Sequence, residues 1–343
     1  MKKRRVFTGL LILIGVVVIW QWGLIVYGVK QASGQLHIVW NARPVSEVLD
    51  DPVTPDSVKR KLLLVQDVRQ YAVDSLGINP SENYTTFFDQ KDDPLMWVVT
   101  GSQPYSMEAY EWKFPIVGGF SYKGYFDKEM AFKEAERLKE KGLDVSIRNP
   151  GGWSTLGYLK DPILSNMLYR GDGRLAEVII HELTHATIYV KDSVDFNENL
   201  ATFIGEQGAL RYIKQLYGQD SRVYREYLLM EEDYEKFTAH MLRGADALEG
   251  LYGSFDENMP ENEKQQKKTE MIDRILAEAD TLSLFQKDLY MGSLLKYEVN
   301  NAYFLSFLRY REQQGDLDSL YTRRFNSDLD ALLSYFKENF PSL

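Results

Sequence analysis

Two histidines and a glutamate have the residue types and spacing best suited to chemistry in this chain. The segment 175–190 reads LAEVIIHELTHATIYV and contains an H-E-x-x-H pattern formed by His181, Glu182 and His185. On a helix, residues four apart lie on one face, so both imidazoles could bind one metal ion. Glu182 would point to an adjacent face, where a carboxylate can take a proton from water without itself binding the metal. The chain has only four histidines, which makes chance a weak explanation of the pattern.

A third ligand is needed, because a catalytic zinc site usually has three protein ligands and one open position. The segment 195–206, DFNENLATFIGE, should be a short loop that enters a second helix, with Glu198 near the helix start. Four apolar residues fall near one helical stripe: Phe196, Leu200, Phe203 and Ile204. Glu198 and Thr202 then share a neighbouring face that can look toward the first helix.

These patterns predict one Zn2+ ion held by His181, His185 and Glu198, with Glu182 as the catalytic base. Glu206, two turns after Glu198, is the main rival for the third position. Two side chains could orient the ligands by hydrogen bonds, although solvent-facing or helix-capping roles suit them equally well: Thr202 and Glu177.

The N-terminus predicts a membrane anchor. After M-K-K-R-R, an apolar run extends from Val6 to Val29, longer than the roughly 20 residues that a spanning helix needs. The preceding cations favour a cytoplasmic N-terminus, so we expect residues 1–30 to cross the lipid bilayer once. The catalytic domain would then lie on the periplasmic or extracellular side. A cleaved signal peptide is the competing interpretation, because KQASGQ at 30–35 offers small residues, but the apolar run exceeds a usual signal core.

The order of elements predicts an α+β fold. Strand-like patterns occupy 95–102, 114–126 and 144–159, with a helix at 127–142, so a small mixed sheet should precede the H-E-x-x-H helix. Later helices are expected at 174–190, 196–216, 220–247, 265–289, 292–313 and 326–340. Residues 31–343 would form the catalytic domain, with an α+β lobe at 31–191 and a helical lobe at 192–343.

Composition narrows the class of protein. At 343 residues and 44% hydrophobic, the chain can bury a substantial core. The net charge of −10 offers no basic face, so nucleic acid is not an expected partner. The chain has no cysteine, which excludes disulfides and a lipid-modified N-terminal cysteine.

Six segments together resemble the successive signature blocks of a bacterial family of predicted aminopeptidases. They are YGVKQASGQL (27–36), FPIVGGFSYKGYFD (114–127), WSTLGYLKDPILSNML (153–168), HELTHATIYV (181–190), FNENLATFIGEQG (196–208) and NNAYFLSF (300–307). The resemblance implies a zincin-like, membrane-associated zinc peptidase whose ligands, similar to a gluzincin arrangement, are His181, His185 and Glu198. Many family members have cysteines around the FPIVGG block, whereas Lys113 and Gly119 stand near those places here.

The expected activity is peptide hydrolysis, with an aminopeptidase favoured over an endopeptidase of the same fold. A membrane-tethered binding domain that keeps the metal without catalysis is the non-enzymatic alternative. An intramembrane protease is disfavoured, because charged residues bracket the motif helix: Arg174, Glu177, Lys191 and Asp192.

The peptide substrate should lie extended along 151–158, GGWSTLGY, where small residues allow close backbone approach. Ser154, Thr155 and Gly157 are therefore candidate substrate-binding residues, although an ordinary strand and turn explains this segment equally well. Tyr303, Tyr189 and Tyr158 are candidates for stabilising the oxyanion, and Tyr303 is taken as a further substrate-binding residue.

Overall fold

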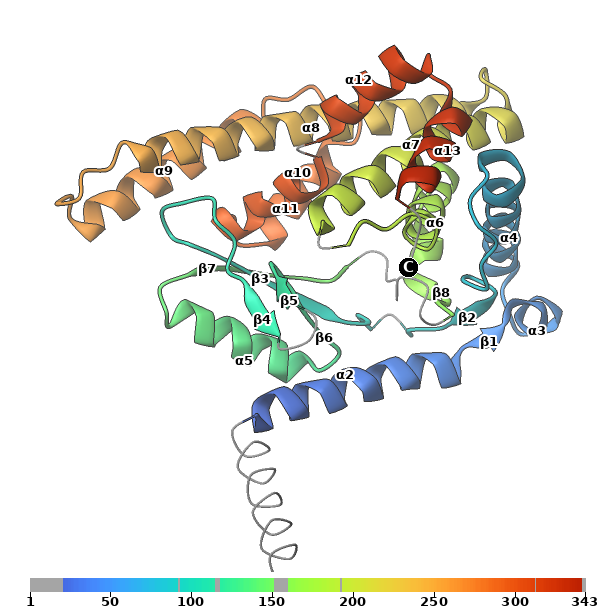
Figure 1. Ribbon diagram of the computed structural model, residues 1–343, viewed down its shortest axis with the longest axis horizontal. Helices are drawn as coiled ribbons and strands as arrows, with labels where there is room; N and C mark the ends of the chain where they lie inside the picture. Colours follow the sequence, from blue (N-terminus) through green and yellow to red (C-terminus); the bar gives the residue numbers. More distant parts are fainter. Residues whose placement is uncertain are drawn as a thin grey trace, which may run out of the picture.

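The computed structural model describes residues 21–91, 93–114, 118–150, 160–191, 193–311 and 313–340 (Figure 1). Helices account for most of these residues. They are α2 (Trp22–Asn41), α3 (Val45–Asp50), α4 (Asp56–Leu76), α5 (Lys128–Lys139), α6 (Asp172–His185), α7 (Val194–Tyr217), α8 (Arg222–Gly253), α9 (Glu261–Ala279), α10 (Lys287–Lys296), α11 (Asn301–Arg311), α12 (Gln314–Phe325) and α13 (Leu329–Asn339). A short 3-10 helix, η1 (Ser165–Tyr169), precedes α6.

The strands form small separate sheets. The central strand β3 (Trp97–Ser102) pairs antiparallel with β6 (Lys123–Tyr125) and β7 (Asp144–Arg148). A second sheet orders β1 (Arg43–Pro44), β2 (Thr86–Phe88) and β8 (Ile163–Leu164), and β4 (Trp112–Phe114) pairs with β5 (Gly118–Phe120). The amphipathic helix α5 packs on the first sheet through Ala131, Ala135 and Leu138, which lie in one core with Val99.

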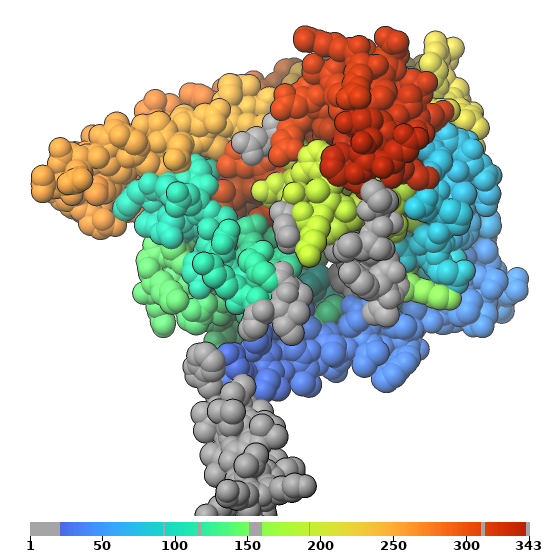
Figure 2. All heavy atoms as spheres, in the orientation of Figure 1, coloured from blue at the N-terminus to red at the C-terminus, as the bar shows by residue number. Residues whose placement is uncertain are grey.

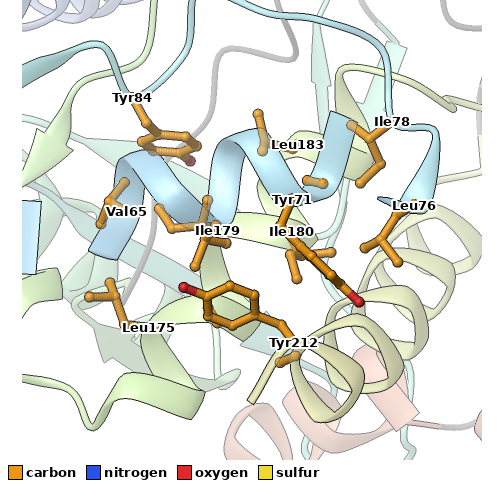
Figure 3. Close-up of a cluster of buried hydrophobic side chains, with 14 of the residues drawn as sticks. Val65, Tyr71, Leu76, Ile78, Tyr84, Leu175, Ile179, Ile180, Leu183 and Tyr212 are labelled. Carbon is orange, nitrogen blue, oxygen red and sulfur yellow. The ribbon is translucent and has the colours of Figure 1, made fainter. Parts of the chain in front are cut away.

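The first and largest core lies where α4, α6 and α7 meet. Leu76 of α4, Ile179 and Ile180 of α6 and Tyr212 of α7 are buried in this core (Figure 3). The rings of Tyr71 and Tyr212 lie 5.1 Å apart, and Tyr212 donates a hydrogen bond to Asp67 at 2.6 Å. Aliphatic side chains at helical spacing thus hold α6 between its two neighbours.

A second core joins α8, α9 and α11 at one end of the molecule. Met241 and Leu248 of α8, Ile275 of α9 and Phe304 of α11 are buried together. In Figure 1, α8 and α9 form a long antiparallel pair that extends away from the first core. This layer contacts the β3–β7 sheet through α11 and through Lys268, whose ammonium lies 2.6 Å from Asp144.

The expected α+β class is wrong. The described residues are mainly helical, with strands of at most six residues. The segment 114–126 forms three short strands rather than one or two long ones, and β7 ends at Arg148. Since the strands are short and interrupted by turns, they form separate small sheets that are subordinate to the helical cores.

The expected transmembrane helix, and the single-pass membrane localisation inferred from it, are also corrected. No helix in the described part of the chain is long and apolar enough to cross a membrane. Residues 1–20, which carry most of the expected span, lie outside the described residues. Residues 22–30 belong to α2, which continues to Asn41 through polar residues and packs against the domain, with Gly34 lying against the Phe126 ring.

Candidate metal centre

The helix α6 presents the two histidines. Asp172 lies in its first turn, where a carboxylate favours the helix dipole, and bonds Lys61 of α4 at 2.7 Å and Tyr217 of α7 at 2.6 Å. One side of α6 is buried in the first core, and the opposite side carries His181 and His185 at i, i+4 spacing. The expected helix at 174–190 therefore exists, but it begins earlier and ends at His185.

A loop between α6 and α7 places the glutamate. Asn197, buried in the first turn of α7, both accepts a hydrogen bond from the Val190 amide at 2.8 Å and donates one to the Val190 carbonyl at 2.7 Å. This pair of bonds ties the loop to the start of α7. Glu198 follows at once and points at α6.

Three donor atoms converge between the two helices. The Nε2 atoms of His181 and His185 lie 3.2 Å apart, and Glu198 Oε2 lies 3.5 Å from the first and 3.7 Å from the second. Within the described ranges, these three residues form the one cluster of three or more metal-ligating side chains, with all donor atoms within 4.8 Å of one another. One cation could therefore contact all three.

Gly205 of α7 allows α6 and α7 to lie this close together. A Cβ built on Gly205 of α7 would lie 3.0 Å from the backbone oxygen of Glu177 and 3.2 Å from the Cβ of His181. Such contacts are closer than side chains normally tolerate. The absence of a side chain at Gly205 therefore keeps α7 close to the turn of α6 that carries His181.

Electrostatics favour an ionised Glu198. Burial raises the pKa of Glu198, but hydrogen bonds from His181 and then His185 outweigh burial and hold that pKa far below its ordinary value. Burial lowers the pKa of His181, yet the bond to Glu198 and the charge of Glu182 raise it overall. The carboxylate of Glu198 therefore favours positive charge at the two imidazoles, and a bound metal ion would supply that charge.

Glu182 differs from Glu198 although both are carboxylates of the same site. Burial raises the pKa of Glu182 above 4.5, and only partial compensation comes from the two histidines. A carboxylate with a raised pKa is a better proton acceptor near neutral pH. Glu182 lies outside the three-residue cluster and so stays free for this role.

The donor set fits zinc. Two imidazole nitrogens and one carboxylate oxygen are the ligands of the catalytic His2Glu zinc class, and they leave a fourth position open. His181 Nδ1 lies 3.5 Å from Thr202 Oγ1, while the buried His185 Nδ1 has no hydrogen-bond partner in the described part of the chain. Both rings therefore direct Nε2 at the shared centre.

Residues 26–338 match the model of the family described as "Putative aminopeptidase". The chain belongs to this family. The match covers most of the chain and places it among peptidase-type hydrolases. None of the curated proteins and none of the solved structures compared with the chain matches it. The family description does not name a metal or a gluzincin arrangement, so both stay predictions.

The other predicted residues of this aminopeptidase-family chain lie in different places. Glu177 is held by Arg174 at 2.8 Å and by the Tyr227 hydroxyl at 3.1 Å, and Glu206 is outside the three-residue cluster. Tyr303 packs in the second core with Tyr297 and Phe307. The remaining residues lie outside the described ranges: Ser154, Thr155, Gly157 and Tyr158.

Two further residues near the site, Tyr122 and Arg309, could not be singled out by a motif or by their spacing in the sequence. Burial raises the pKa of Tyr122, between β5 and β6, to about 12, with smaller contributions from Glu198 and Glu182. The guanidinium carbon of Arg309 on α11 lies over the Tyr122 ring, 4.9 Å from its centre. Tyr122 stands inside the FPIVGGFSYKGYFD block, and Arg309 follows the NNAYFLSF block. Only the fold shows that these two segments meet beside α7.

Proposed function

We propose that this chain is a zinc-dependent aminopeptidase in which His181, His185 and Glu198 hold one Zn2+ ion. The observation that carries the proposal is the convergence of the three donor atoms within 4.8 Å, from two helices that the first core locks together. Membership of an aminopeptidase family supports the reaction class. Glu182, adjacent to the first ligand, is the proposed general base.

The residues divide the chemistry between them. Zinc, when bound, lowers the pKa of water and polarises the carbonyl group of a peptide bond. Glu182 takes the proton of the attacking water and delivers it to the leaving amine nitrogen. Its burial supports this task, because burial raises the pKa of the carboxyl group and so makes it a stronger base.

Glu198 and the two histidines contribute to catalysis because the fold already holds their side chains in position. Glu198 is tied to its place by Asn197 and Asn199, its neighbours on α7, and the latter donates hydrogen bonds to the carbonyls of Asp195 at 2.8 Å and Arg309 at 2.6 Å. A preorganised donor set does not need to reorder when the reaction proceeds.

The test is Glu182→Gln in the full-length chain, with Glu235→Gln of the exposed face of α8 as matched control. We expect Glu182→Gln to retain about one zinc per chain and to hydrolyse unblocked aminoacyl fluorogenic substrates about 10²–10⁴-fold more slowly. Glu235→Gln should behave as the unmodified protein. Zinc is measured by mass spectrometry of the dialysed protein.

Three other outcomes would each point elsewhere. Full activity in Glu182→Gln would remove that residue as the base. Cleavage of N-blocked peptides alone would indicate an endopeptidase. Bound zinc without hydrolysis of either substrate type would indicate a binding domain that retains the metal.

A further inference from the structure

The helix α2 packs on the rest of the domain through one side. Ile38 is buried in the first core, and the Tyr27 hydroxyl donates a hydrogen bond to the Gly124 carbonyl at 3.0 Å. Lys30, the only charged residue of α2, forms an ion pair with Asp127 at 3.0 Å. These contacts fix the inner side of the helix. Ile38 is the only buried residue of α2, so much of the helix surface is exposed.

An apolar stripe, which we call the α2 stripe, runs along the outer side of the helix. Five large apolar residues are exposed there: Trp22 (61%), Ile25 (38%), Val29 (63%), Leu36 (42%) and Trp40 (77%). The exposed small residues Ala32 and Ser33 fill the interval between Val29 and Leu36. Intervals of three and four residues place these side chains on one narrow face, which is the kind of seam that a second helix packs against. In Figures 1 and 2, α2 forms the lower edge of the domain.

The α2 stripe is large enough for an interface. If a whole tryptophan side chain has about 250 Å² and the aliphatic ones somewhat less, the exposed fractions correspond to about 600 Å² of apolar surface. Two such stripes facing each other would bury about 1,200 Å², the lower limit of specific protein–protein interfaces. An apolar patch of this size on a protein surface is typical of an interaction site.

The charges around the α2 stripe favour a second copy of this chain over a lipid surface. Helices that lie on membranes usually have a polar side rich in Lys and Arg. α2 has one such residue, Lys30, which is already paired with Asp127. Two copies of a chain with a net charge of −10 repel each other, but the α2 stripe carries no charged residue. The copies can therefore meet there without placing like charges in contact.

The residues of the α2 stripe become smaller from both ends toward the centre. Trp22 and Trp40 stand at the two ends, and Ala32 and Ser33 lie near the centre. A symmetric pair of identical chains requires a self-complementary surface, in which each residue meets a different residue of the other copy. A stripe with the same order of sizes from either end meets this requirement when the two helices run in opposite directions. The antiparallel arrangement also opposes the two helix dipoles.

We propose that α2 pairs antiparallel with α2 of a second copy of this chain, so that the α2 stripe is the interface of a homodimer. In this arrangement Ile25 meets Leu36 of the second copy, and Val29 meets Ala32 of the second copy. The large side chains then pack at both ends while the small ones let the helices approach at the centre. The inference does not depend on the proposed peptidase function.

Leu36→Glu and Leu295→Glu test the interface in the full-length chain. Leu295 is a matched control because it is a leucine of α10 that is 89% exposed and lies outside the α2 stripe. Sedimentation velocity should show a dimer of the unmodified chain with a Kd of about 1–10 µM. Leu36→Glu should raise this Kd by at least about 100-fold, because it buries an unpaired charge, and Leu295→Glu should leave it unchanged. Circular dichroism of both variants checks that the fold is kept.

The absence of cysteine from the chain allows a test of the antiparallel geometry. Val29→Cys and Ala32→Cys are prepared separately, one with an enlarged tag, and are mixed under mild oxidation. Antiparallel pairing should give the disulfide between the two different variants about tenfold more often than a disulfide between identical ones. Parallel pairing would reverse this preference and contradict the proposal.

Vesicles of phosphatidylcholine and phosphatidylglycerol distinguish a lipid surface from a second copy. If the disulfide between the two variants forms equally well when vesicles are present, the second copy covers the α2 stripe. If the chain binds the vesicles as a monomer and this disulfide is lost, lipid covers the stripe and the proposal is wrong. A monomer at about 50 µM, or association that Leu36→Glu does not weaken, would also overturn it.

Discussion

Glu198 is the residue on which the proposed metal centre depends most. Without it, the two imidazoles of α6, whose Nε2 atoms lie 3.2 Å apart, would have no carboxylate to complete the set of three donor atoms. Its pKa, held far below the ordinary value by the two histidines against the effect of burial, keeps it ionised at all physiological pH values. Glu206 lies two turns further along the same helix and does not join the cluster.

Replacing Glu198 and Glu206 with glutamine, one at a time, tests which of the two is the third metal ligand. Glu198→Gln should weaken zinc binding by more than the roughly 10–100-fold typical of residues that only support a ligand, because it removes a ligand charge. Glu206→Gln should leave zinc affinity within a few-fold. The affinities are measured by competition with a chromogenic chelator. Zinc loss in Glu206→Gln with retention in Glu198→Gln would exchange the third ligand.

The closeness of the three proposed ligands could be predicted because their spacing is local. His181 and His185 share one helix, and Glu198 is thirteen residues later on the next, so helical periodicity alone puts the three near one another. Tyr122 and Arg309 could not be predicted, because Ser121 and Arg309 are 188 positions apart in the chain. Nothing in local spacing reports such a contact.

At the scale of elements, the closeness of α6 and α7 is what brings ligands from two helices together. Gly205 and Gly208 face α6, and a Cβ on Gly208 would lie 2.9 Å from Leu76 Cδ1 and 3.1 Å from Ile180. Of the two, Gly205 lies beside His181 and against backbone, which cannot rotate away as a side chain can.

Gly205→Ala should therefore push α7 away from α6. Overpacking costs about 1–3 kcal/mol, more than the roughly 1 kcal/mol that alanine gains over glycine in a helix. We expect a lower free energy of unfolding in urea and weaker zinc binding. Gly250→Ala on the exposed side of α8, where an added Cβ meets nothing within 4 Å, is the control and should stabilise the protein by about 0.5–1 kcal/mol.

Unchanged zinc affinity in Gly205→Ala would show that the helix spacing is not decisive for the site. Equal stabilisation by both substitutions would show that α7 moves without cost. Either result would oppose the view that Gly205 sets the distance between His181 and Glu198.

The break between α9 and α10 could not be predicted from the local sequence pattern. The predicted helix at 265–289 is broken in the structure, because α9 ends at Ala279 and α10 begins at Lys287. The buried carboxylate of Asp233 on α8 accepts hydrogen bonds from the Phe285 and Gln286 amides at 2.7 and 2.6 Å and so fixes the intervening turn. A partner more than fifty residues away is invisible to periodicity.

At the scale of the molecule, a buried ion pair connects the second core to the β3–β7 sheet. Lys268 of α9 donates to Asp144 of β7 at 2.6 Å and to the Pro104 carbonyl at 3.0 Å. Asp144 also accepts a hydrogen bond from the Asn301 amide at the start of α11 at 2.8 Å. The side chain of Lys268 is 3% exposed, so the pair is shielded from water.

Removing one partner of the Lys268–Asp144 pair should lower the free energy of unfolding by more per residue than removing both charges together. Lys268→Met leaves a mostly buried carboxylate without its cation, and we expect a loss of about 2–4 kcal/mol in the free energy of unfolding. Asp144→Asn should have a loss of the same order, because it leaves Lys268 buried without its anion. The double substitution should cost less than the sum, since no buried charge is left unpaired. Strictly additive costs in urea unfolding would mean that the two residues act independently.

The overall architecture was the hardest part to predict. The strand patterns predicted at 95–102, 114–126 and 144–159 overlap the short strands β3, β4 to β6 and β7. Periodicity does not show how short the paired stretches are, and the α+β expectation followed from this. The apolar run from Val6 also continued into α2, whose later half mixes polar and apolar residues and lies against Phe126 at Gly34. The extent of a sheet and the packing of a helix depend on contacts distant in the chain.

Zinc K-edge X-ray absorption on the full-length chain, loaded with one equivalent of Zn2+, tests the metal centre most directly. We expect two imidazole nitrogens at about 2.0–2.1 Å and a carboxylate oxygen at about 2.0–2.2 Å, with one imidazole fewer in His185→Ala. A spectrum with only oxygen neighbours, or one unaltered by His185→Ala, would contradict zinc coordination by His181, His185 and Glu198.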